Sequence, residues 1–220
     1  MRSLSELVGQ NLLWQVQPGS ASIPDQAQQS YVLFRGDEPV VQAQTIWQRN
    51  DHFDLVMESG EGTHQVHMDL TGPKRSSVVW KLGETASAAA FELVSESIIT
   101  CTGWINTASQ RTLAWVPTRE MGGEYTIFVP GGPRLITLEV PASIHIGGNP
   151  GAMTLAPEMA ADADLAPLVA LGFAIANEQV RLLHRAVTPG GPGQQFQPTP
   201  EQLKQMEDVF KLLGVKPRRI

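Results

Sequence analysis

The segment Leu165-Ala-Pro-Leu-Val-Ala-Leu-Gly-Phe-Ala-Ile-Ala176 is apolar on every side when it is drawn as a helix. Asp164 stands before it as an N-cap, and Pro167 falls in the first turn, where its missing N–H costs little. A helix that is apolar all round is buried in a protein core or in a bilayer. Twelve residues reach only about 18 Å, short of the ~30 Å of bilayer hydrocarbon. The segment therefore predicts a core helix, with an interfacial or membrane role as the alternative.

The chain before this helix carries hydrophobic residues that alternate with polar ones between residues 31 and 156, the pattern of half-buried strands. Glycine- and proline-rich turns separate the runs, and about ten strands fit. Their connections are mostly shorter than the ~10–12 residues that a parallel crossover needs, so the sheet is expected to be antiparallel. The clearest inward-facing sets are Val41, Ala43, Thr45 and Trp47; Phe53, Leu55 and Met57; Val66, Met68 and Leu70; Val78, Trp80 and Leu82; Leu113 and Trp115; and Tyr125, Ile127 and Val129.

The two ends of the chain are expected to carry short helices. Residues 3–14 are predicted to form one, because Ser3 and Glu6 have the spacing of a capping box. A second helix is predicted over residues 199–213, after a flexible linker at 188–198. Its apolar face is made by Leu203, Met206, Phe210 and Leu213. A free helix of this length is marginal in water, so this face is expected to bind the chain's own barrel, a second copy or a protein partner.

These segments divide the chain into an N-terminal helix and linker (1–30), a β domain with the apolar helix (31–187), and a linker with the C-terminal helix (188–220). The 220 residues, 42% of them hydrophobic, are enough for one sizeable core. The formal net charge of −6 argues against broad attraction to nucleic acid or anionic membranes. The N-terminus lacks the continuous apolar run of a secretory signal, so a cytoplasmic location is expected.

No catalytic residue, metal site or cofactor is predicted. The single cysteine, Cys101, has no partner for a disulfide or a CxxC motif and is expected to be an inert thiol. His64 and His67 lie three apart on a predicted strand, so their side chains fall on opposite faces and do not chelate one ion. The tryptophans are expected in the core, with a stacking platform for bases or sugars as the alternative: Trp14, Trp47, Trp80, Trp104 and Trp115.

Lys74, Arg75 and Lys81 form the densest basic cluster in the strand region. The cluster is compatible with weak binding of an anion or a lipid headgroup. A solvated turn is the other interpretation, and it is the one expected to hold.

The order of elements resembles the tubby C-terminal-like fold, shared by Tubby, LURP-one-related proteins and phospholipid scramblases. The likeness covers residues 31–187, with about ten antiparallel strands followed by a helix apolar on all sides. It implies a mostly β, closed antiparallel barrel of about ten to twelve strands around a central helix that runs from Leu165 to about Ala186. The cysteine cluster of animal scramblases has no counterpart here, since Cys101 stands alone.

Three functions remain open at this point. The resemblance and the missing catalytic signature favour a non-enzymatic binding or scaffold module, with a protein or an anionic lipid as partner. The alternative is an enzyme or small-molecule carrier with a pocket at the barrel mouth. Lipid scrambling would require the apolar helix to associate with a membrane.

Overall fold

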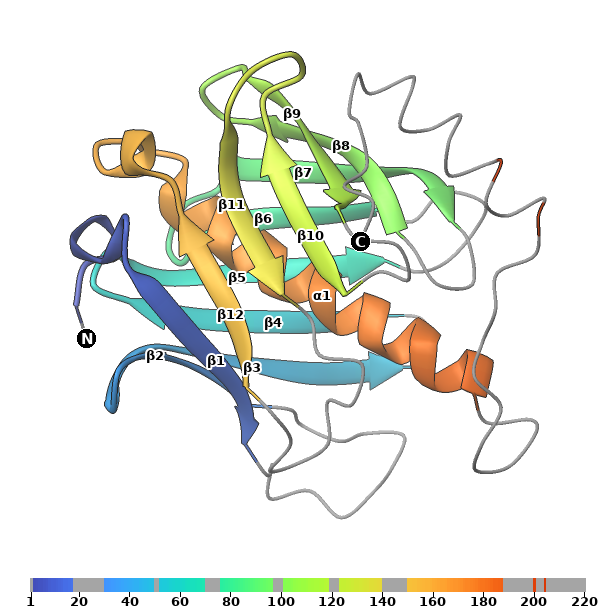
Figure 1. Cartoon of the computed structure of the whole chain (residues 1–220), viewed down its shortest axis with the longest axis horizontal. Coiled ribbons are helices and arrows are strands. Elements are labelled where there is room, and N and C mark those ends of the chain that lie inside the picture. Colours follow the sequence, from blue (N-terminus) through green and yellow to red (C-terminus); the bar gives the residue numbers. More distant parts are fainter. Residues whose placement is uncertain are drawn as a thin grey trace.

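The computed structural model describes residues 2–17, 30–49, 52–69, 76–96, 101–118, 123–139, 150–187, 200 and 204. It is a closed antiparallel barrel of twelve strands, and helix α1 (Leu165–Val187) runs through it (Figure 1). This confirms the expected fold class: the core helix and antiparallel strands that the residue pattern predicts, and the closed barrel that the resemblance implies. The helix extends to Val187, as expected for the continuation beyond Ala176.

The strands follow one another around the barrel in chain order. Each strand from β2 to β12 pairs with the next, and β1 lies between β12 and β2 and closes the ring. Because the barrel is closed, each of these strands has two neighbours and no exposed edge. The strands are β1 (Asn11–Gln17), β2 (Ser30–Arg35), β3 (Glu38–Arg49), β4 (His52–Ser59), β5 (Gly62–Asp69), β6 (Ser76–Lys81), β7 (Ser87–Glu96), β8 (Cys101–Thr107), β9 (Thr112–Pro117), β10 (Glu124–Phe128), β11 (Arg134–Glu139) and β12 (Gly151–Leu155).

The N-terminal segment differs from the helix predicted over residues 3–14. A single 3-10 turn, η1 (Leu4–Leu7), ends before Gly9, which has a φ of 74° that glycine adopts readily. Strand β1 follows and pairs with both β2 and β12, so the barrel begins before residue 31. Leu12 faces the core in this strand. The prediction was wrong beyond Leu7 because pairing on both sides outweighs the helical spacing of a few leucines.

Helix α1 is enclosed over most of its length, with every side chain from Leu165 to Glu178 buried. Its backbone lies closest to β3–β7. On another side the wider gap is filled by Trp115, whose ring stacks on Tyr125 at 5.2 Å and lies 3.9 Å from where a Cβ on Gly172 would be. No helix in the described part of the chain is long and apolar enough to cross a membrane.

A second aromatic group fills the lumen beside β1 and β2. The ring of Phe173 in α1 lies 6.2 Å from that of Trp14 and 6.0 Å from that of Tyr31. The Tyr31 hydroxyl donates a hydrogen bond to the side-chain oxygen of Asn177 in the buried core. Burial raises the pKa of Tyr31, so the phenol keeps its proton and remains a donor.

One predicted strand has the opposite face inward. In β6 the buried side chains are Ser77 and Val79, whereas Val78 and Trp80 are half-buried and Leu82 beyond the strand is 66% exposed. The prediction of Val78, Trp80 and Leu82 as the inward set was therefore wrong. Valine occupies both faces at this point, so the alternation of apolar and polar residues does not identify the core side.

We expect Leu171→Asp to lower the free energy of unfolding by about 4 kcal/mol or more, because truncating a core leucine alone costs about 2–5 kcal/mol and a buried charge adds to that. Leu171 is fully buried in α1. Leu82→Asp is the matched control and should leave stability nearly unchanged, since Leu82 is 66% exposed. Urea unfolding of the two variants measures the difference. Equal stabilities would contradict an enclosed helix.

Candidate functional site

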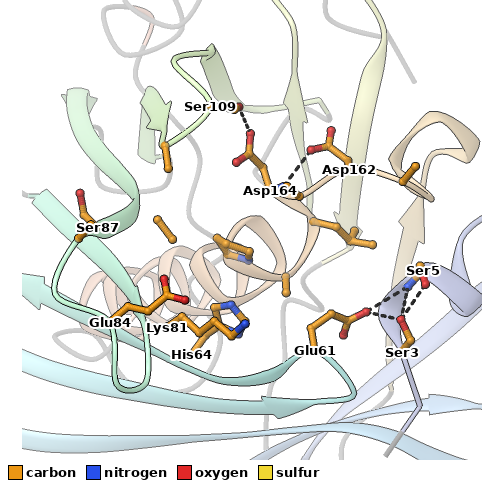
Figure 2. A pocket seen from close by; sticks show the side chains of 18 of the residues that line it. Ser3, Ser5, Glu61, His64, Lys81, Glu84, Ser87, Ser109, Asp162 and Asp164 are labelled. Atoms are coloured by element: carbon orange, nitrogen blue, oxygen red, sulfur yellow. Dashed lines mark hydrogen bonds between the residues drawn. The ribbon is translucent and has the colours of Figure 1, made fainter.

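A cavity of about 620 Å³ opens at the end of the barrel where α1 begins (Figure 2). Five separate segments form its wall: the N-terminal turn η1, the β4–β5 hairpin, the β6–β7 hairpin, the β8–β9 turn and the stretch that leads into α1. The polar side chains that line it are Ser3, Ser5, Glu61, His64, Lys81, Glu84, Ser87, Ser109, Asp162 and Asp164. Between them lie mostly alanines, so much of the remaining wall is apolar and made by small side chains.

Glu61 fastens the N-terminal turn to the β4–β5 hairpin. Its Oε1 accepts hydrogen bonds from the Ser3 hydroxyl and, at 2.6 Å, from the backbone N–H of Leu4. The backbone at Gly60 also donates to the carbonyl of Arg2 at 2.9 Å, and a Cβ at this glycine would lie 2.5 Å from the Arg2 backbone. The backbone N–H of Glu61 also donates to the hydroxyl oxygen of the neighbouring Ser59 at 3.3 Å.

The Glu61 carboxylate is ionised, but only one of its two oxygens has hydrogen-bond donors. Burial raises its pKa, but the hydrogen bonds from Ser3, Ser59 and the backbone N–H groups outweigh burial and leave the pKa below its usual value. The second oxygen, Oε2, is buried and has no hydrogen-bond partner. A buried charged acceptor without a donor is costly, so this oxygen is suited to a ligand that donates a hydrogen bond.

His64 projects inward from β5 and is 3% exposed. Its Nδ1 is buried and has no hydrogen-bond partner. Burial lowers the pKa of His64, and the charge of Lys81, which lies directly opposite on β6, lowers it further; Glu61 and Glu84 oppose this. The ring is therefore neutral near pH 7 and offers one donor and one acceptor nitrogen.

A cluster of charged side chains fixes the start of α1. Arg111 donates from Nη2 to Asp162 Oδ1 at 2.7 Å and to Asp164 Oδ2 at 2.6 Å. The Ser109 hydroxyl also donates to Asp164, whose side chain is thus directed to the β8–β9 turn. At the helix start, Asp164 contributes its backbone carbonyl, which accepts from Leu168 N–H at 2.9 Å. The predicted N-cap position is correct, while the carboxylate binds Arg111.

The charges around the cavity favour some ligands over others. Four carboxylates line it, those of Glu61, Glu84, Asp162 and Asp164, whereas Lys81 is the basic side chain in the wall and Arg111 reaches it from outside. This excess of negative charge disfavours a phosphate or carboxylate group and favours a neutral or cationic ligand. A smaller hollow of about 260 Å³ over β1–β4 is lined by three glutamines, Glu58 and five other residues, and none of these described residues has a buried acceptor without a partner.

Two serine hydroxyls of the cavity wall are bound to carboxylates. The hydroxyls of Ser3 and Ser109 are hydrogen-bonded to carboxylates, and neither bonds to His64. A serine nucleophile needs a base within hydrogen-bond reach to take its proton. Among the described residues, neither of these two serines forms a serine–histidine pair.

Of the three residues in the predicted basic cluster, the structure describes Lys81. Lys81 is exposed and lines the cavity, so it faces carboxylates rather than an open basic surface. Lys74 and Arg75 lie outside the described residues. The predicted partner-binding face also lies outside them: Leu203, Met206, Phe210 and Leu213.

The histidines and the cysteine considered as metal ligands or reactive groups lie at several places in the fold. His64 and His67 face opposite sides of β5, as predicted, and His67 Nδ1 lies 2.7 Å from Asp54 Oδ1 on the outer side. In the ranges that the structure describes, no group of three or more histidine, cysteine, aspartate or glutamate side chains could hold a metal ion. Cys101 begins β8, but its side chain is outside the described set.

Two of the five tryptophans meet the expectation of core packing. Trp14 and Trp115 are buried in the lumen, while Trp80 and Trp104 are half-buried on the outer surface. The side chain of Trp47 is not among the described ones.

Sequence reasoning missed Glu61, Glu84 and Arg111. Gly60-Glu61-Gly62 has the composition of a turn, although a glutamate between two glycines is free to reach back to another element. Arg111 lies 51 residues before Asp162, and no pattern in the sequence brings them together. The signal that was available is the pair Asp162 and Asp164 directly before an apolar helix.

No family model, curated protein or solved structure matches the chain.

We expect His64 to make the protein less stable as the pH falls. Its folded-state pKa is below the ordinary value of 6.5, so the unfolded chain takes up the proton first, and stability is lost as the pH drops below about 6.5 toward the folded-state pKa. His64→Gln should reduce the loss of unfolding free energy between pH 7.5 and pH 5.

Denaturant unfolding at the two pH values checks this. His67→Gln is the matched control, since it removes a histidine from the outer face of the same strand. It should retain the acid-dependent loss. An identical pH dependence in the wild type and in His64→Gln would contradict the prediction.

Proposed function

We propose that this protein is a non-enzymatic binding module that holds a small polar ligand in the cavity at the barrel mouth. The observation that carries the proposal is the presence of two buried and unpartnered polar atoms in the cavity wall, Glu61 Oε2 and His64 Nδ1. Buried polar atoms in folded proteins nearly always have a partner, so such atoms indicate a place for a ligand or a bound water.

The chemistry of the wall defines the class of ligand. Glu61 Oε2 is an acceptor and requires a hydroxyl or amine donor, while Lys81 and Ser87 at the wall offer donors in return. The four carboxylates disfavour an anion. We therefore infer a neutral polyhydroxyl compound or an amine, and not the anionic lipid that the resemblance implies.

The filled lumen supports this location for the ligand. Small carriers of the barrel type hold their ligand in the interior, but here α1 and the aromatic rings of Trp14, Trp115 and Phe173 occupy that space. The mouth is the part of the interior where side chains are small and polar. A barrel around an apolar helix is also what the tubby C-terminal-like resemblance implies, and membership of that group is part of the proposal.

A cytoplasmic location belongs to the proposal as well, supported by the single cysteine and the acidic composition. The alternative of an enzyme rests on the same cavity. It would have to use groups other than a serine–histidine pair built on Ser3 or Ser109, because these hydroxyls donate to carboxylates and neither bonds to His64.

A screen of small polar compounds by thermal shift and ligand-observed NMR tests the proposal. Polyols, amines, amino acids and inorganic phosphate are the probes, and the first two classes should bind. A ligand at 100 times its Kd stabilises the folded state by about 2.7 kcal/mol, which is a shift of several degrees. Glu61→Gln should weaken binding, because it removes the charge from the acceptor.

A variant that fills the cavity tests whether the ligand binds there or elsewhere on the protein. Ala161 is an exposed residue in the cavity wall, and Ala161→Trp should abolish binding without disturbing the core. Asn106→Trp is the matched control on the exposed surface of β8 and should bind normally. Binding that survives in Ala161→Trp, or binding of phosphate alone, would overturn the proposal.

A further inference from the structure

The polar groups of the cavity at the barrel mouth differ in how far the protein itself satisfies them. Asp162 and Asp164 are bound by Arg111 at 2.7 and 2.6 Å, which partly neutralises both carboxylates. Among the described residues that line the cavity, the buried polar atoms without a hydrogen-bond partner are Glu61 Oε2 and His64 Nδ1. These two atoms, and not the aspartates, are therefore the ones that a ligand is left to satisfy.

Glu61 and His64 belong to the same hairpin and face the same space (Figure 2). Glu61 lies in the turn between β4 and β5, and His64 is the third residue of β5. The charge of Glu61 raises the pKa of His64, so the carboxylate is within electrostatic reach of the ring. The neighbouring strands do not supply Nδ1 with a partner, because Met57 on β4 is apolar and Lys81 on β6 makes no hydrogen bond to this atom.

The two atoms together favour an ammonium group over a hydroxyl group. Glu61 Oε2 carries negative charge, and a charge-assisted hydrogen bond is roughly twice as strong as a neutral one. An ammonium group has three donors and no acceptor, so it donates to the carboxylate and to an imidazole nitrogen without turning a lone pair to the other carboxylates. A hydroxyl group has a single donor, and its lone pairs face the negative wall of the cavity.

Charged groups reach the surroundings of His64 from each described element that forms this part of the wall. They are Glu61 in the β4–β5 turn, Lys81 at the end of β6, Glu84 in the β6–β7 hairpin, and Asp162 and Asp164 with Arg111 at the start of α1. Acids outnumber bases in this set, so a cation is favoured while the ring is neutral. A protonated ring would be a second cation and would have no acceptor left to offer.

We propose that the ligand of this cavity is a small organic amine whose ammonium group donates to Glu61 Oε2 and His64 Nδ1, and that protonation of His64 releases it. This inference rests on the proposed function and narrows the ligand to one chemical class. Because linkage is reciprocal, the proton weakens binding of the amine by the same factor as the amine weakens binding of the proton. The ligand is held near pH 7, where His64 is neutral, and is lost as the pH falls through the folded-state pKa of His64.

Isothermal titration calorimetry of the full-length protein at pH 7.5 tests the ligand class. The probe 1,4-diaminobutane should bind, whereas 1,4-butanediol, which has the same carbon chain without charge, should bind about tenfold more weakly or less. The permethylated, bis-quaternary form of the diamine keeps both charges but has no N–H donor, so it should also bind weakly. Glu61→Gln should weaken binding of the diamine, and Lys81→Met should strengthen it because a like charge is removed.

The pH dependence of the affinity tests the role of His64. NMR first gives the titration midpoint of His64 in the ligand-free protein, and the affinity for the diamine is then compared one pH unit above and one pH unit below this midpoint. The neutral fraction of the ring falls from about 90% to about 10% over this interval, so the affinity should fall about tenfold. The diamine stays charged throughout, since alkylamines titrate at about pH 10, as lysine does.

Two further measurements separate His64 from the other titrating groups. His64→Gln should bind the diamine more weakly at the higher pH and lose the tenfold dependence, while His67→Gln, on the outer face of the same strand, should keep it. Calorimetry of the wild type in buffers of different ionisation enthalpy needs no variant. At the His64 midpoint, binding of the diamine should release about half a proton.

The outcomes distinguish this inference from the proposed function. Binding of the diol as tightly as the diamine would overturn the inference and leave the proposed function standing. Binding of the diamine without proton release, or a pH dependence that persists in His64→Gln, would also overturn the inference alone. If neither probe nor any other compound of the screen binds, the inference and the proposed function fail together.

Discussion

The enclosure of helix α1 is the constraint on which the rest of the structure depends. A helix with apolar side chains on all sides has no face for water, so the sheet must surround it, and closure into a barrel is the way a sheet does this. The helix does not fill the lumen evenly. It lies closest to β3–β7, and the rings of Trp14, Tyr31, Trp115 and Tyr125 occupy the rest.

Polar side chains gather at the end of the barrel where α1 begins and the apolar core ends. At the start of α1, Glu61 and His64 line the cavity, and the cluster of Arg111 with Asp162 and Asp164 adjoins it. Hydrogen bonds fix Glu61 and the Arg111–aspartate cluster in place, so this part of the wall keeps its shape without a ligand. A rigid barrel that presents a preorganised polar site at one end is suited to binding, since little ordering is required when the ligand arrives.

The sequence predicted the parts of the fold that depend on local pattern. The apolar helix and the alternation around Phe53 and Leu55 are both strong periodic signals, and both were correct. Two predictions were wrong: the helix where the structure has β1, and the choice of inward face for β6. In both places the residue pattern fits two structures equally well, and only the neighbouring strands decide between them. The cavity could not be predicted, since it joins segments as far apart as Ser3 and Asp164. Only the acids before the helix gave a local hint.

The position of α1 in the chain has a consequence for how this protein folds. The helix follows all twelve strands in sequence, and β1 at the other end supplies the strand that closes the ring. During synthesis the barrel therefore lacks its core until residues 165–187 have been made, and until then the inner faces of the strands have no helix to pack against. Contacts between distant parts of a chain form slowly, and unfilled apolar surfaces aggregate. The nascent chain of this protein should consequently depend on chaperones more than its mature stability would suggest.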